Sequence, residues 1–158
     1  MDNLTNLHLT DVLALQYNVM GELQRRGVSR SISNPVGQLA EYLFSGAFGW
    51  TLARSGGVTT ATSAKGSRIR IRSRRVVASD AEANFTAIDE IDDESFDWVA
   101  LAVFHQNWAV CRAAVMPVPL AQSLADPENG RLDFSDAILD VEGVFDATEM
   151  VTRQLARG

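Results

Sequence analysis

Arginine stands at every second position of one short segment, "SRIRIRSRR" at residues 67–75, and isoleucine fills the gaps at Ile69 and Ile71. Alternation with a period of two is the pattern of a β-strand, because successive side chains of a strand point to opposite faces of the sheet. We therefore predict a strand over residues 67–77 that is interior to its sheet, with both isoleucines packed under a helix. The other face of that strand then carries four guanidinium groups, those of Arg68, Arg70, Arg72 and Arg74, which we call the arginine row.

The arginine row limits what can surround it. A guanidinium group keeps its charge at any ordinary pH, and charges about 7 Å apart, two residues of strand rise, repel one another. The row must therefore be solvated, paired with carboxylates or occupied by an anionic ligand, and the sequence leaves these three interpretations open. The third favours phosphate, most simply on DNA, and adds the neighbouring Lys65 and Arg75 as candidate contacts.

Charge is divided unevenly along the chain. Residues 1–79 hold ten Lys or Arg against four Asp or Glu, a net charge of +6, whereas residues 80–158 hold four against sixteen, a net charge of −12. The overall charge of −6 does not exclude nucleic-acid binding, because the local potential of the basic half governs the approach of a polyanion. The same division permits the acidic segment 89–97 to neutralise the arginine row, within one chain or in a homodimer.

The composition is that of one globular domain, which we assign to residues 1–158. Of these residues, 46% are hydrophobic and 22% charged, and no apolar run reaches the ~18 residues of a membrane-spanning helix. The N-terminus lacks the basic start and apolar block of a secretory signal, so we expect a cytoplasmic protein without a membrane partner. Cys111 is the single cysteine, so it cannot form an internal disulfide. The two histidines, His8 and His105, are too few for a metal cluster, and no cofactor is expected.

Periodicity and capping residues predict the order of the elements. Two helices come first, over 10–26 and from the Asn34–Pro35 cap to Gly49. Strands are predicted over 57–62, 67–77, 96–104 and 108–117, the last two as a hairpin. A short helix after Pro117 and Pro119 and a last helix capped by Asp146 or Thr148 follow, and residues 78–95 and 126–134 are predicted as loops, the first with a short element inside it. The fold class is α+β, with N-terminal helices packed on a central mixed or antiparallel sheet of about four to five strands and small C-terminal helices.

Two segments resemble a known nuclease superfamily. Residues 26–43, "RGVSRSISNPVGQLAEYL", are similar to "RGV-R-S-x-x-NP-x-G-x-x-AEYL", and residues 66–75, "GSRIRIRSRR", are similar to "G-x-R-x-Q-V-K-x-R". Both patterns are typical of small bacterial and phage domains of the PD-(D/E)XK superfamily. The resemblance covers residues 10–120 as a nuclease-like core and leaves 121–158 as a C-terminal extension with an acidic loop and the last helix. It implies a restriction-endonuclease-like fold.

The same resemblance implies that the catalytic site has degenerated. In active members an Asp and a Glu or Gln on consecutive strands bind magnesium, a Lys assists the attacking water, and a helix Glu often contributes. The matching positions here are Thr60 (or Thr59), Arg70, Arg72 and Glu41. Glu41 alone beside fixed cations is a poor magnesium site, and Arg72 cannot usefully exchange a proton. The resemblance therefore implies no catalytic residues and no metal.

Three functional hypotheses arise from these patterns. The first is a catalytically inactive nuclease-like protein that binds DNA or another polyanion through an arginine-lined pocket, unless Glu41 pairs internally with Arg70 or Arg72. The second is a protein-interaction module that assembles as a homodimer through its basic and acidic halves. The third is a residual metal-dependent DNA nuclease that uses other carboxylates, such as Asp80 or Glu82.

Overall fold

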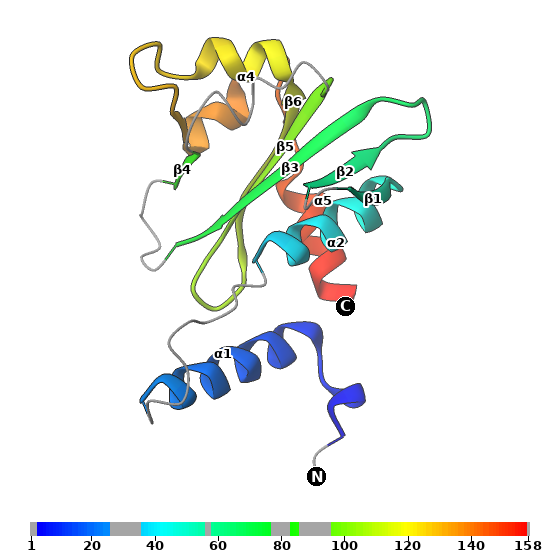
Figure 1. The fold of residues 1–158 in the computed structure, drawn as a ribbon, viewed down its shortest axis with the longest axis vertical. Helices are drawn as coiled ribbons and strands as arrows, with labels where there is room; N and C mark the ends of the chain where they lie inside the picture. The colour runs from blue at the N-terminus through cyan, green and yellow to red at the C-terminus, as the bar shows by residue number, and fades with distance from the viewer. Residues whose placement is uncertain (1–2, 26–35, 56–57, 77–82, 86–95, 158) are drawn as a thin grey trace.

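A computed structural model describes residues 3–25, 36–55, 58–76, 83–85 and 96–157 of the chain (Figure 1). A six-stranded sheet with the strand order β1-β2-β3-β5-β6-β8 forms its centre, and helices pack around that sheet. The prediction of a single α+β domain is confirmed, and of the two predicted kinds of sheet, mixed or antiparallel, the structure has the mixed one.

The central sheet and its helices have well-defined bounds. The strands of the central sheet are β1 (Thr51–Ser55), β2 (Val58–Thr62), β3 (Arg68–Arg75), β5 (Trp98–Phe104), β6 (Val110–Pro117) and β8 (Phe145–Asp146). A two-stranded sheet pairs β4 (Ala83–Phe85) with β7 (Leu132–Phe134). The helices are α1 (Leu9–Arg25), α2 (Val36–Phe48), α4 (Val118–Leu124) and α5 (Thr148–Arg157), with 3₁₀ helices η1 (Leu4–Asn6) and η2 (Asp136–Asp140).

Strand β3 lies in the interior of the sheet, as the sequence predicts. It pairs antiparallel with β2 on one side and parallel with β5 on the other, and the parallel register runs from Ile69 opposite Trp98 to Arg75 opposite Phe104. The remaining neighbours in the sheet are antiparallel, including the predicted β5–β6 hairpin. The sheet is therefore mixed because of this one parallel pair.

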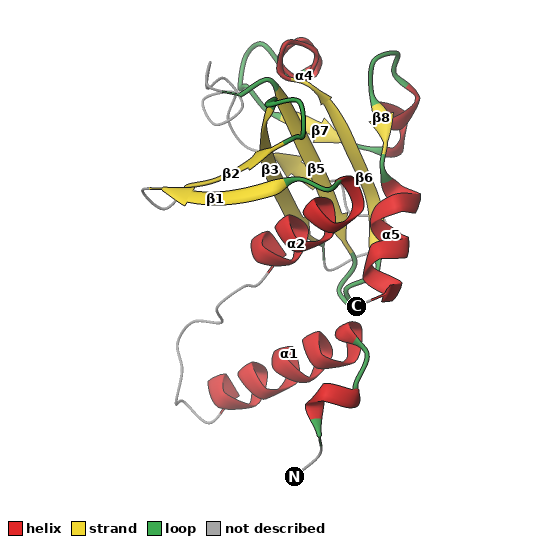
Figure 2. Cartoon of the chain, turned by 90° about the vertical axis from the view of Figure 1, so that its right-hand side faces the viewer, coloured by secondary structure: helices red, strands yellow, loops and turns green. Residues whose placement is uncertain are grey.

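Two layers cover the two faces of the central sheet (Figure 2). Helices α2 and α5 pack side by side on one face, which we call the helical face. Elements α4, β7 and η2 cover the opposite face, which we call the arginine face because the arginine row projects from it. Each face has its own cluster of buried side chains, with Leu43 and Phe44 of α2 in the first and Leu132 and Phe134 of β7 in the second.

The central strand β5 is buried on both faces, and this explains its continuous apolar sequence. Its side chains alternate between the two clusters: Ala100, Ala102 and Phe104 belong to the helical face, and Val99, Leu101 and Val103 to the arginine face. A strand covered on both sides needs apolar residues at every position, so it shows no polar alternation. β5 thus anchors both layers.

The isoleucines of β3 pack under α2, as predicted. Ile69 is 2% exposed, and the half-buried Ile71 packs against the same cluster. Two positions further along, the Ser73 hydroxyl donates a hydrogen bond of 3.1 Å to the Val36 carbonyl oxygen at the start of α2. These contacts fix which face of β3 meets the helix, and hence which face carries the arginines.

The described sheet has six strands, more than the predicted four to five. Strand β1 was not predicted, because this edge strand is exposed at Leu52 and lacks a buried alternating face. Strand β8 is too short to show a period, and β7 lies in the segment 126–134 that the sequence predicts as a loop. The predicted Asn34–Pro35 cap lies outside the described residues.

The two C-terminal helices begin close to the predicted positions. Pro117 is the N-cap of α4. At the start of α5, Asp146 Oδ1 accepts a hydrogen bond of 3.0 Å from the Thr148 backbone N–H, while the Thr148 hydroxyl accepts one of 3.0 Å from the Ala113 N–H of β6. Asp146 therefore satisfies the first backbone N–H of α5, and Thr148 attaches the helix to the sheet.

Membrane insertion of a helix is not supported by any part of the chain that the structure describes. Within these residues, no helix combines the length and apolar character needed to cross a bilayer.

Burial on the helical face predicts how substitutions in β3 change stability. Ile69→Asp places an unpaired carboxylate under α2 and should lower the free energy of unfolding by about 3–5 kcal/mol. Ile71→Asp, at a half-buried position, should cost about 2–3 kcal/mol, and Leu52→Asp on the exposed edge strand under about 1 kcal/mol. Urea denaturation measures all three. Equal effects of the three substitutions would contradict the assigned facing of β3.

Candidate functional site

The four side chains of the arginine row project from one face of the sheet, as predicted. They alternate with the residues packed under α2 and lie beside Val99, Leu101 and Val103 of the parallel strand β5. Arg68 and Arg74 are exposed, and Arg70 and Arg72 are half-buried. The row therefore forms a partly accessible line of positive charge on the arginine face.

Phe96 organises the first two arginines of the row. The guanidinium carbons of Arg68 and Arg70 lie 5.4 and 5.6 Å from the centroid of its ring, which is a cation–π distance. Phe96 itself is 6% exposed and belongs to the cluster on the arginine face. One buried ring thus holds two like charges, a role that the sequence does not reveal because Phe96 reads only as the start of an apolar run.

Asp97, next to Phe96, joins the start of β3 to the start of β5. Its Oδ2 atom accepts a hydrogen bond of 2.9 Å from the Arg68 backbone N–H, and its own N–H donates one of 2.9 Å to the Arg68 carbonyl oxygen. Asp97 therefore holds the backbone of the row. Within the described residues it forms no ion pair with a guanidinium group. Acidic residues 89–95, the predicted neutralising segment, lie outside the described residues.

The two ends of the arginine row differ in their surroundings. Arg72 and Arg74 each interact with another residue, and Nη1 of Arg72 is a buried atom. Arg68 is exposed, and its neighbour Arg70 is half-buried against Phe96. Both ends of the row are exposed, and at the Arg68 end the Phe96 ring positions two guanidinium groups side by side.

A fifth arginine lies on the same face and was not predicted. Arg112 of β6 stands opposite Val103, which in turn stands opposite Arg74, so all three side chains share the arginine face. Arg112 is 8% exposed, and its Nε atom lies 3.3 Å from Asp136 Oδ1 of η2. Its sequence signal is a charged residue inside an apolar strand, since a buried charge needs a partner. The pair attaches η2 to the sheet.

Arg75 does not belong to the row. The alternation of β3 turns it to the helical face, where its guanidinium carbon lies 4.4 Å from the Tyr17 ring centroid and 4.2 Å from that of Trp108. Its Nε also donates a hydrogen bond of 3.1 Å to the Gln106 carbonyl oxygen. Partial burial lowers the pKa of Arg75, because desolvation disfavours the charged form. Arg75 thus connects α1 to the β5–β6 turn.

Lys65 is also separate from the row. It lies in the turn between β2 and β3 and lines a pocket on the helical face together with Trp50 and Trp98. The predicted set of six basic contacts is therefore divided by the sheet, with four arginines on one face and Lys65 and Arg75 on the other.

The four positions that match the nuclease motif do not meet on one face. Ala61 stands opposite Ile69 on the helical face, so Thr60 of β2 projects to the arginine face with Arg70 and Arg72. Glu41 belongs to α2, which packs on the other face. In the described ranges Glu41 has no hydrogen bond or ion pair, so the internal pairing with Arg70 or Arg72 is not found there.

Two further kinds of side chain bear on the chemistry of the protein, the cysteine thiol and the residue types that bind metal ions. Burial raises the pKa of the Cys111 thiol, which keeps this lone cysteine in its neutral form. Among the residues with described positions, no three His, Cys, Asp or Glu side chains gather in a way that could hold a metal ion. Asp80 and Glu82, the candidate carboxylates of a residual nuclease, lie outside those positions.

Comparison with known proteins gives no family for this chain. No protein-family model matches the sequence, and no curated protein matches it. A function must therefore be inferred from the residues on the arginine face and from the contacts that position them.

The contacts of Arg75 predict how α1 is held. Arg75→Gln removes stacking contacts of about 1–2 kcal/mol, so amide hydrogen exchange in α1 should accelerate roughly tenfold. Arg74→Gln, the neighbouring residue on the opposite face, is the matched control and should leave exchange in α1 unchanged. Hydrogen exchange followed by mass spectrometry measures both. An equal response of the two variants would contradict the separate roles of these arginines.

Proposed function

We propose that this chain is a catalytically inactive nuclease-like domain that binds DNA or another polyanion through the arginine row. The observation that carries the proposal is the placement of Arg68 and Arg70 over one buried ring, that of Phe96. A guanidinium group that is already positioned loses less conformational entropy when it binds, and it offers paired N–H donors to phosphate oxygens. Such a pair, on a strand that carries two further arginines on the same face, favours an anionic ligand.

The length of the row favours a polyanion over a single anion. From Arg68 to Arg74 the strand rises by about 20 Å, at roughly 3.3 Å per residue. A single phosphate or carboxylate contacts only one or two of these arginines. A nucleic-acid backbone carries negative charge along its whole length and can meet several of them in succession.

The arrangement of the motif positions supports binding without cleavage. Phosphoryl transfer assisted by a metal needs carboxylates that converge on the ion. Here Thr60, Arg70 and Arg72 share one face, whereas Glu41 is on the helix that covers the other. Cations occupy the positions where the superfamily places metal ligands and the proton-transfer group, and they attract a phosphate without activating water.

Binding through the row predicts a strong dependence on salt. Each phosphate neutralised on duplex DNA contributes about −0.9 to the slope of log affinity against log salt, so three or four engaged arginines give roughly −3 to −4. Arg70→Gln should reduce the magnitude of that slope by about one and weaken binding to different sequences equally. Fluorescence anisotropy with a labelled duplex and a labelled single strand, from 20 to about 200 mM salt, measures the slope.

Arg54→Gln provides a matched control for this titration. Arg54 is an exposed arginine of the same sheet, and its partner Thr59 shares the face of Ala61, so it projects from the helical face. Its removal should leave the slope unchanged. Absence of binding by the parent protein at low salt would remove nucleic acid as the ligand, and sedimentation equilibrium would then test the homodimer formed by the basic and acidic halves.

The degenerate motif predicts no metal-dependent cleavage. Purified protein incubated with supercoiled plasmid and magnesium or manganese should leave the plasmid intact, because only one carboxylate remains at the motif positions. Agarose gel electrophoresis detects nicking and linearisation. Cleavage that is abolished by Glu41→Ala, and not by Glu149→Ala on the exposed face of α5, would show that the site is catalytic after all.

A further inference from the structure

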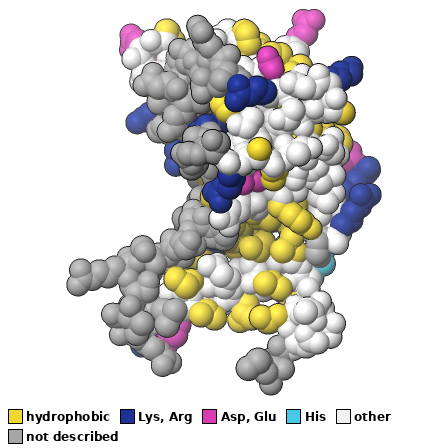
Figure 3. Space-filling view, turned by 45° about the vertical axis from the view of Figure 1, so that its right-hand side comes forward, with side chains coloured by type: hydrophobic (Ala, Val, Ile, Leu, Met, Phe, Trp, Pro, Cys, Tyr) yellow, Lys and Arg dark blue, Asp and Glu magenta, His cyan; other side chains and the backbone are white. Residues whose placement is uncertain are grey.

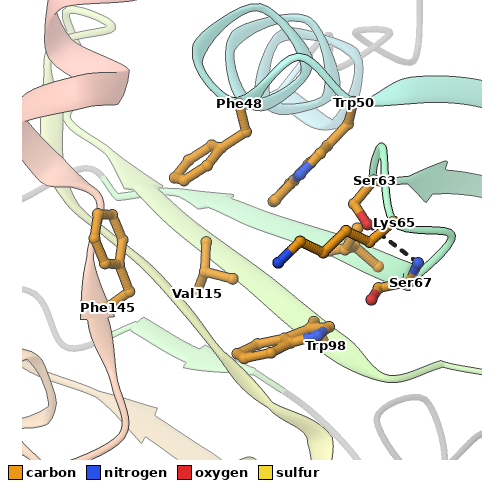
Figure 4. A pocket seen from close by; sticks show the side chains of 9 residues that line it. Phe48, Trp50, Ser63, Lys65, Ser67, Trp98, Val115 and Phe145 are labelled. Carbon is orange, nitrogen blue, oxygen red and sulfur yellow. Dashed lines mark hydrogen bonds between the residues drawn. The ribbon is translucent and has the colours of Figure 1, made fainter.

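A second candidate site lies on the helical face, near the turn that joins β2 and β3. It is a pocket of about 340 Å³, which we call the aromatic pocket. Its apolar walls and floor consist of Phe48, Trp50, Ile69, Trp98, Val115 and Phe145 (Figure 4). These residues come from α2, the segment before β1, and strands β3, β5, β6 and β8, so the pocket forms only when the whole sheet is assembled.

The aromatic rings of the pocket stand as two walls with a space between them. Phe48 and Trp50 stack with ring centroids 4.8 Å apart and planes 17° from parallel, and the ring of Phe145 meets Phe48 edge-on at 5.8 Å. Figure 4 shows Trp98 on the side of the pocket opposite Phe48 and Trp50. Ile69 and Val115, which also line the pocket, are buried. A flat ring between these walls can stack on one aromatic face and meet the edge of another.

Two of these aromatic side chains remain open to solvent. Trp98 is 37% exposed and Phe145 is 51% exposed, although both border an apolar floor. Hollowed apolar surface with a few polar groups at its edge is the usual form of a small-molecule site. Exposure of this kind favours a ligand that covers the rings.

Lys65 supplies the polar group of the aromatic pocket. The turn that carries it is held by hydrogen bonds from the Gly66 N–H to the Ser63 carbonyl oxygen, 2.9 Å, and from the Ser67 N–H to the Ser63 hydroxyl, 3.1 Å. Gly66 has a φ of 87°, a conformation that glycine adopts without strain. Figure 4 shows the Lys65 side chain lying across the pocket with its ammonium group directed toward the middle. None of the ion pairs among the described residues involves Lys65.

We propose that the aromatic pocket binds a small planar aromatic ring that carries a carboxylate or a phosphate. The ring lies between the Phe48–Trp50 wall and Trp98, and the anionic group meets the Lys65 ammonium. Lys65 is exposed, so its ammonium is hydrated in the free protein, and at the edge of the pocket it attracts an anionic group and repels an aromatic cation. This site is on the face opposite the arginine row, so it is independent of the nucleic-acid binding proposed above.

The tryptophans provide a direct readout of this binding. The chain has three tryptophans, and Trp50 and Trp98 line the aromatic pocket while Trp108 is buried near α1. In ¹⁵N-labelled protein, the indole N–H signals of Trp50 and Trp98 should shift on titration, and that of Trp108 should not. The probes are indole-3-carboxylate and uridine 5′-monophosphate, with indole-3-carboxamide and uridine as neutral counterparts and cyclohexanecarboxylate as the non-aromatic anion.

Matched variants separate the role of the charge from that of the rings. Lys65→Gln should weaken binding of either anionic probe about tenfold, as expected for the loss of one hydrogen bond to a charged group, and leave binding of its neutral counterpart unchanged. Phe145→Ala should weaken the charged and neutral probes alike. Arg131→Gln, at an exposed arginine remote from the pocket lining, should have no effect. Tighter binding of the carboxylate or of the phosphate probe identifies which kind of aromatic anion the site takes.

Several results would overturn the proposal. The first is the absence of indole shifts with every aromatic anion at millimolar concentration. The second is binding of cyclohexanecarboxylate as tight as that of indole-3-carboxylate. The third is binding of the anionic probes by the Lys65→Gln variant as tight as by the parent protein. Indole shifts that track protein concentration instead of probe concentration would assign the pocket to a second copy of the chain, and would overturn it too. None of these results bears on the salt titration with DNA, so the two proposals fail separately.

Discussion

The facing of β3 is the constraint on which the rest of the structure depends. Ile69 and Arg70 are neighbours in sequence, yet one is buried under α2 and the other projects from the opposite face. A slip of one residue against β5 would exchange the two sets and place four guanidinium groups under the helix. Burying even one unpaired charge costs an amount comparable to the whole stability of a small domain. The alternation therefore fixes the register, and the register fixes both candidate sites.

Aromatic rings lie beside four arginines of this sheet in the part of the chain that the structure describes. Phe96 lies beside Arg68 and Arg70, Phe134 lies 5.8 Å from the guanidinium carbon of Arg112, and two rings flank Arg75. A guanidinium group is weakly hydrated and stacks on rings, which lysine does less well. The surface of α1 is different, since Leu15 and Val19 of this helix are exposed. Figure 3 shows hydrophobic side chains gathered on the lower part of the molecule, where α1 lies. Several charges on the sheet thus lie against rings, whereas α1 exposes apolar side chains to solvent.

Much of the fold could be predicted from the sequence because its signals are periodic or local. The β3 alternation, the apolar runs of β5 and β6, and the proline at the start of α4 each depend on a few adjacent residues. The strands that were missed, β1, β7 and β8, are short or lie at an edge, and they are defined by their partners more than by their own residues. Of the candidate site, the sequence predicted the arginine row as a set on one face, and it grouped Lys65 and Arg75 with that row although the sheet separates them.

By itself the sequence determined the α+β class, the existence of β3 and the concentration of charge on one side of it. Side chains of a strand alternate between its two faces, so this information lies in adjacent residues. Only the tertiary structure decided which groups meet that charge. Phe96, Arg112 and the walls of the aromatic pocket come from segments far apart in the chain, and the motif position Glu41 is on the helix that covers the opposite face. Such pairings depend on strand order and helix packing, which bring distant segments together through burial of the whole core and leave no trace in any local pattern.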